Sequence, residues 1–81
     1  MKGENDLKNI LLEIKKLDEG NERNFLLQSL YSTEKYIKSN DKQSLKNIVL
    51  RLNGLYPAMS EKAQEISLMI INEIMEVQKK K

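Results

Sequence analysis

The chain has 81 residues, of which 40% are hydrophobic and 32% are charged, so it has room for one soluble domain with a modest core. It contains neither cysteine nor histidine, which excludes disulfides, thiolate zinc sites, a cysteine nucleophile and any mechanism that depends on histidine. The net charge of +2 comes from the lysines at 79–81, because the 11 other basic residues face 12 acidic ones and do not cluster as they do in nucleic-acid-binding proteins.

The first amphipathic segment predicts a helix over residues 6–19. Asp6 is the candidate N-cap, and Gly20 is expected to end the helix in the left-handed conformation. Five apolar residues follow the i, i+3, i+4, i+7 spacing of one helical face: Leu7, Ile10, Leu11, Ile14 and Leu17.

A second helix is predicted over residues 22–39, followed by a polar turn at 39–41 that offers caps for the next helix. Phe25 and Tyr36 fall together on one side of this helix, and Leu27 and Tyr31 fall on the other. Its main apolar stripe consists of Leu26, Leu30, Thr33 and Ile37.

Two further helices are predicted over residues 42–53 and 61–79. The first should stop at Asn53–Gly54, and residues 55–59 should form a connector in which Pro57 keeps Tyr56 away from helical angles. Ser60 is the expected cap of the last helix. The stripes of these two helices are Leu45, Ile48, Val49 and Leu52, then Ala63, Ile66, Ile70, Ile74 and Val77.

Two segments of the chain are similar to each other. Residues 7–12 (LKNILL) and 45–50 (LKNIVL) share five identities at a spacing of 38 residues. Each segment opens a helix that is followed by a longer helix, so the chain reads as two αα-hairpins. Two such units are too few for a solenoid, and short connections make neighbouring helices antiparallel. The sequence therefore predicts one all-α domain, an antiparallel four-helix bundle.

Pairs of carboxylates are the only candidate catalytic groups in the chain. Glu61 with Glu65, and Glu73 with Glu76, share one face of the last helix, which we interpret as a solvated surface. No phosphate-binding, dinucleotide-binding or calcium-binding motif is present. We therefore expect no enzyme, no catalytic residue, and no cofactor or metal.

The hydropathy pattern predicts a cytoplasmic protein. The longest apolar run, residues 68–71, is far shorter than the roughly 20 residues of a membrane span, and no secretory signal is apparent at the start.

Apolar residues outside the main stripes are the candidates for binding a partner. On the last helix, Leu68, Ile71 and Met75 form a flank that either packs against a second neighbour or forms a groove or dimer seam. Leu12 and Leu50 hold equivalent places in the repeated segments, among lysines and asparagines. The full set of candidates is Leu68, Ile71, Met75, Met69, Leu12, Leu50, Phe25 and Tyr36.

The order of segments also resembles a known family. A helix rich in Leu and Tyr ends in Lys-Ser-Asn-Asp at 38–41, and the run LKNIVLRL at 45–52 leads through Leu-Tyr-Pro at 55–57 to Ser-Glu-Lys-Ala-Gln-Glu-Ile at 60–66. Over residues 22–77 this is similar to the small immunity proteins of pediocin-like (class IIa) bacteriocins, including the enterocin A immunity family. The resemblance implies a cytosolic antiparallel four-helix bundle that protects the producer cell by acting on a bacteriocin-bound sugar-transporter receptor, with specificity in the C-terminal half.

Three hypotheses of function follow. The first is a protein-binding module that blocks or protects a protein partner, most specifically a bacteriocin immunity-like protein. The second is a regulatory or phage-encoded helical interaction protein, including a homodimer, that acts by occupying a partner's surface. The third, a nucleic-acid-associated protein using the lysine tail, is disfavoured because Arg23 and Arg51 are isolated from one another and no basic face is evident.

Overall fold

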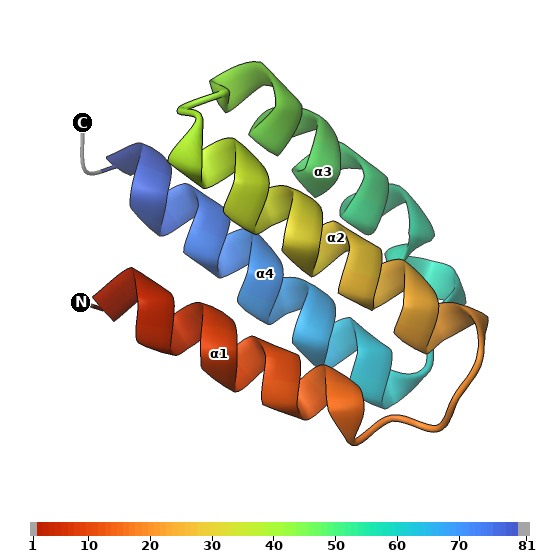
Figure 1. The fold of residues 1–81 in the computed structure, drawn as a ribbon. Coiled ribbons are helices and arrows are strands. Elements are labelled where there is room, and N and C mark those ends of the chain that lie inside the picture. Colours follow the sequence, from red (N-terminus) through yellow and green to blue (C-terminus); the bar gives the residue numbers. More distant parts are fainter. Residues whose placement is uncertain (1, 80–81) are drawn as a thin grey trace.

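The predicted all-α fold is confirmed. A computed structural model describes the backbone of residues 2–79 and the side chains of residues 7–79. Its elements, in chain order, are the helices α1 (Lys2–Lys15), α2 (Asn21–Lys38) and α3 (Lys42–Leu55), a 3₁₀ turn η1 (Tyr56–Ala58), and the helix α4 (Glu61–Lys79). Successive helices run in opposite directions, so α2 and α4 point the same way (Figure 1).

The four helices do not form a square. Within the described residues, α2 and α4 contact each other through the middle of the bundle, whereas α1 and α3 each contact both central helices but not one another. Figure 1 accordingly shows α1 and α3 at opposite edges, with α4 and α2 between them. The molecule is flattened, with extents of 35 × 25 × 16 Å. The helix α4 therefore has three neighbours, which explains its wide apolar arc.

The two central helices, α2 and α4, carry small buried side chains. Ser29 and Thr33 on α2, and Ala63 and Ser67 on α4, are all buried. Small buried side chains allow helices to pack closely, because the distance between packed helices depends on the side chains between them. The buried hydroxyls have acceptors: Thr33 Oγ1 donates to the Ser29 carbonyl at 2.7 Å, and Ser67 Oγ donates to Met59 Sδ at 3.0 Å.

The apolar core lies between all four helices. Among the described side chains, each outer helix contributes two buried hydrophobic residues, and the larger share comes from the central pair. The buried hydrophobic residues are Ile10, Ile14, Leu26, Leu30, Leu45, Leu52, Ala63, Ile66, Ile70, Ile71 and Ile74.

Hydrogen bonds at the end of α2 and at the start of α3 hold the turn between these two helices. Asn40 adopts the left-handed conformation with φ 59°, and its N–H donates to the Ile37 carbonyl while the Asp41 N–H donates to the Tyr36 carbonyl. This pair of bonds is a Schellman motif. Asp41 then caps α3, because its carboxylate accepts from the Ser44 N–H at 3.1 Å and the Ser44 hydroxyl at 2.8 Å. The Ser44 hydroxyl first, and the Ser44 N–H second, lower the pKa of Asp41.

Two expectations about the ends of α1 are wrong. The helix begins at Lys2, so Asp6 lies inside it and is not the N-cap. It ends at Lys15, where the N–H groups of Lys16 and Leu17 donate three residues back, to Glu13 and Ile14. Gly20 is extended, with φ 162°, and precedes α2 instead of ending α1.

Two expectations about the end of α3 are also wrong. Gly54 does not stop the helix, which continues to Leu55. Tyr56 keeps helical angles, φ −51° and ψ −48°, although it precedes Pro57, which is tolerated in the first turn of η1 because its missing N–H is not needed there. The expected cap at Ser60 is confirmed, since Ser60 Oγ accepts from the Ala63 N–H at 3.4 Å.

Candidate partner-binding surface

Four of the eight candidate residues are exposed. The exposed fractions are 58% for Leu12, 62% for Leu50, 44% for Leu68 and 56% for Met75. Ile71 is different: only 7% of it is exposed, and it belongs to the core. The helical period fits this difference in exposure, because Ile71 lies about 40–60° around α4 from Leu68 and Met75, toward the buried Ser67.

The other three candidates are packing residues at the edge of the core. Met69, Phe25 and Tyr36 are half-buried, and all three pack against the core. Phe25 and Tyr36 share one side of α2, and the Lys35 ammonium lies 5.8 Å from the centre of the Tyr36 ring. This side of α2 is therefore mainly a packing surface.

Sequence reasoning missed two exposed residues. Tyr31 and Leu55 have exposed fractions of 54% and 45%. The signal for Tyr31 was its distance of about 140° around α2 from Leu26, next to charged residues. Leu55 gave no such signal, because its place depends on α3 continuing past Gly54.

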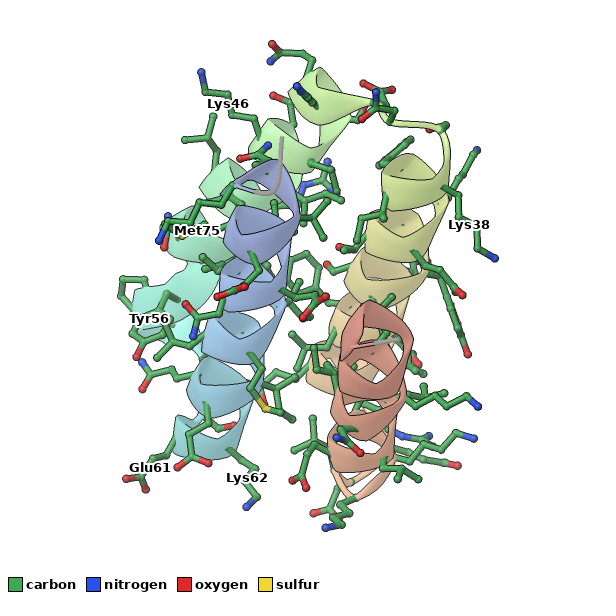
Figure 2. The ribbon with its side chains drawn as sticks, turned by 90° about the vertical axis from the view of Figure 1, so that its left-hand side faces the viewer. Lys38, Lys46, Tyr56, Glu61, Lys62 and Met75 are labelled. Atoms are coloured by element: carbon green, nitrogen blue, oxygen red, sulfur yellow. The ribbon has the colours of Figure 1, made fainter. Side chains whose placement is uncertain are left out.

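Leu50, Leu68 and Met75 gather on the outer face of the α3–α4 hairpin. Leu68 and Met75 are seven residues apart and thus nearly in line along α4. Figure 2 shows Met75 and Lys46 on the same side of the molecule, away from α1 and α2. Leu50 follows Lys46 by one turn of α3, so it shares that side. These three residues, called here the hairpin face, form the candidate surface.

Charged groups border the hairpin face. Lys46 lies on α3, and Glu61, Glu65 and Glu76 are exposed on α4. Beside Met75, a solvent-open pocket is lined by Asn72, Glu76, Gln78 and Lys79.

The predicted solvated carboxylates are exposed with one exception. Glu73 is buried, with 6% exposed, although the sequence placed it on the solvated face. It follows the buried Ile70 by three residues, so the two are neighbours on the surface of α4, a helix that packs against three others.

Polar contacts at the far end of the bundle hold the two hairpins together. The carboxylate of Glu22 at the start of α2 accepts from the Ser60 N–H at 2.7 Å and the Ser60 hydroxyl at 2.9 Å. Gln64 Nε2 donates to the Tyr56 carbonyl at 2.9 Å, which fixes η1 on α4. These hydrogen bonds therefore hold the α3–α4 hairpin, which carries the hairpin face, against the start of α2.

Neither a metal site nor a membrane-spanning helix is present within residues 2–79. No group of three or more acidic side chains could hold a metal ion there, and none of the described helices is long and apolar enough to cross a membrane. Of the lysine tail, residues 80 and 81 lie outside the described part of the chain.

Comparison with protein-family models, with curated proteins and with solved structures finds no match to this chain. The resemblance to bacteriocin immunity proteins therefore stays a prediction.

Proposed function

We propose that this chain is a non-enzymatic helical module that binds a protein partner and thereby blocks or protects it. The observation that carries the proposal is the hairpin face: Leu50, Leu68 and Met75 are each exposed by 44% or more. Scattered exposed apolar residues are normal, but several on one face of a small domain favour an interaction surface. Methionine is among the residue types that are enriched at protein interfaces relative to the rest of the surface.

The specific form that we propose is bacteriocin immunity in the cytoplasm. Two features support it. The fold is an all-α bundle with antiparallel neighbours, as the resemblance implies, and the hairpin face lies in the C-terminal half of the chain, where the resemblance places specificity. The partner would then be a sugar-transporter receptor with bacteriocin bound.

A protection assay tests this form. The chain is expressed in a strain sensitive to a pediocin-like bacteriocin, and the inhibitory concentration is measured. We expect protection, and at least a tenfold loss of it when Leu68 and Met75 are both replaced by serine. The matched control is Tyr31→Ser, because Tyr31 is as exposed as these residues but lies on α2. If the wild-type chain gives no protection against any such bacteriocin, the immunity form is wrong.

A second experiment tests partner binding in general. A photo-crosslinking residue is placed at position 68 in cells, and the same residue at position 31 serves as the control. We expect one discrete crosslinked product at position 68 and none at position 31. Equal, diffuse crosslinking at both positions would contradict the hairpin face as the binding surface.

A further inference from the structure

The outer side of α4 carries a stripe of exposed residues that runs the whole length of the helix. Glu61 and Lys79 are 18 residues apart, which is five full turns, so they lie on one line along the helix. Every residue of α4 within about 40° of that line is exposed. These residues, called here the outer stripe, are Glu61, Glu65, Leu68, Asn72, Met75 and Lys79.

The outer stripe has opposite charges at its two ends. Its first two residues are carboxylates, its last residue is an ammonium, and the exposed Leu68 and Met75 lie between them. Figure 2 shows the same order on the hairpin side of the molecule, with Lys46 and Glu61 at opposite ends. The helix dipole favours this order of charges, but it does not account for two exposed apolar residues on the same line.

The charges of the outer stripe are unpaired within the chain. Among the described residues, the ion pairs lie at 13–38, and none involves Glu61, Glu65 or Lys79. Glu61 and Glu65 are one turn apart, and two like charges at this spacing slightly destabilise a helix. Glu76 is three residues from Lys79, but it lies about 60° off the line and does not pair with it. The charges at both ends of the stripe are therefore available to a second molecule.

A stripe of this kind is complementary to a second copy of itself. In a twofold dimer the same surface of both copies meets, so that surface must complement itself. When two stripes run antiparallel with Leu68 opposite Met75 of the second copy, Lys79 comes opposite position 64, three residues from Glu61 and one from Glu65. The symmetry forms this charged contact twice, whereas a parallel pair of stripes would place like charges together.

The α3–α4 hairpin is large enough for such a contact. The 19 residues of α4 span about 28 Å at 1.5 Å per residue, and two neighbouring helices are about 20 Å wide, so the face covers roughly 560 Å² in projection. The smaller specific interfaces bury about 600 Å² per partner. The size of the face therefore fits a weak, reversible dimer.

We propose that a second copy of this chain covers the hairpin face, in a twofold dimer whose α4 helices pack antiparallel along the outer stripe. Leu68 and Met75 form the apolar centre of the interface, and the charged ends of the two stripes pair on either side of it. Leu50, beside the stripe on α3, faces α3 of the second copy.

This inference rests on the proposed function for the role of the hairpin face, and it adds a form of regulation. A partner that binds the hairpin face competes with the second copy. Binding of that partner therefore weakens as the concentration of the chain rises past the dissociation constant of the dimer.

Sedimentation equilibrium of the full chain measures the dimer. We expect reversible dimerisation between about 1 µM and 1 mM chain, and weaker dimerisation at high salt, because salt screens the charged contacts. Replacing Leu68 and Met75 together with serine should weaken the dimer at least tenfold, and so should Lys79→Glu, because the symmetry places each substitution in the interface twice. A chain that stays monomeric at about 1 mM overturns the proposal and leaves the face to a different partner.

The matched control for the charge reversal is Lys38→Glu. Lys38 is exposed on α2, and Figure 2 shows it on the opposite side of the molecule from Met75. This variant should dimerise as the wild type does. An equal loss in Lys38→Glu and Lys79→Glu would show that net charge, and not the outer stripe, controls the association, and would overturn the proposal.

Mixing two variants tests the antiparallel arrangement. The double variant Glu61→Lys with Glu65→Lys, and the single variant Lys79→Glu, should each be mainly monomeric, because every charged contact then joins like charges. An equimolar mixture should recover the dimer, since each contact between the two variants joins opposite charges. Circular dichroism checks that both variants are folded. If two folded variants do not associate on mixing, the antiparallel contact is wrong.

The dimer and the proposed function are decided by separate measurements. If a chain that never dimerises still gives protection in the bacteriocin assay, this inference alone is wrong. If the chain dimerises through the outer stripe but gives no protection, the inference stands and the immunity form is wrong.

Discussion

The two outer helices have the same inward sequence pattern but differ at their ends. Each contributes two buried residues to the core, Ile10 and Ile14 from α1, Leu45 and Leu52 from α3, and each contacts both central helices. The helix α3 starts at the capped turn of Asp41 and runs directly into η1, which Gln64 fixes on α4. Among the described residues, the end of α1 shows only local contacts: the backbone bonds of its last turn and the ion pair of Lys16 Nζ with Glu13 Oε2 at 3.2 Å.

This difference separates two kinds of information in the repeat. The shared segment specifies which side of a helix is buried, because burial depends on the spacing of apolar residues. The ends depend on single residues that are not repeated: Asn40 and Asp41 precede α3, whereas their counterparts 38 positions earlier, Lys2 and Gly3, lie within α1. We therefore expect equal core contributions from the two helices and a more protected start for α3.

The largest effect should come from removing equivalent core residues. Ile14 and Leu52 are 38 residues apart and fully buried. Replacing either with alanine leaves a cavity, so we expect each variant to lose about 2–5 kcal/mol of stability in urea denaturation. Similar losses would support equivalent packing of α1 and α3. A loss below about 1 kcal/mol for one variant alone would show that the bundle closes around that helix differently.

Sequence periodicity predicts the four helices and most of their buried residues, because the apolar stripe on the inward side of each helix is long and regular. It fails for Ile71 and Glu73, whose burial depends on α4 having three neighbours instead of two. The number of neighbours that a helix has is a property of the whole bundle, and the spacing of apolar residues along one helix does not report it. Sequence reasoning also fails for Gly20 and Gly54, because a glycine permits a helix to stop without requiring it. The exposure of Leu12 and Leu50 was predictable, since polar residues surround both.

The next effect tests the turn that only α3 has. Asn40 is left-handed, a conformation that costs residues with a side chain about 1–2 kcal/mol unless glycine or asparagine is present. Asn40→Ala should therefore lose about 1 kcal/mol, and Asn40→Gly should be neutral or better. In the other connection, Gly20 is extended and no atom lies within 4 Å of an added Cβ, so Gly20→Ala should be neutral or gain about 0.4–1 kcal/mol. Equal losses in both connections, by thermal melts, would contradict this contrast.

A smaller, pH-dependent effect belongs to the cap of α3. The hydrogen bonds from Ser44 lower the pKa of Asp41 in the folded chain. A lowered folded pKa means that this stabilisation is present above the unfolded value, about 4, and is lost as the pH falls through the folded value. Asp41→Asn keeps a capping side chain but cannot titrate. Between pH 5 and about 2, the wild type should therefore lose more stability than Asp41→Asn. Parallel curves for the two proteins would show that the cap contributes no acid sensitivity.

The smallest effect is expected where the outer helices are most alike. Leu12 and Leu50 are exposed, so replacing either with serine removes little buried surface and should change stability by no more than about 0.5 kcal/mol. Denaturation of both variants beside Ile14→Ala and Leu52→Ala measures this directly. If both leucine variants remain as stable as the wild type, folding depends on neither leucine, and a loss of partner binding in the same variants reports on the surface alone. If either loses 2 kcal/mol or more, that leucine supports the fold, and its place in the repeat is explained by packing.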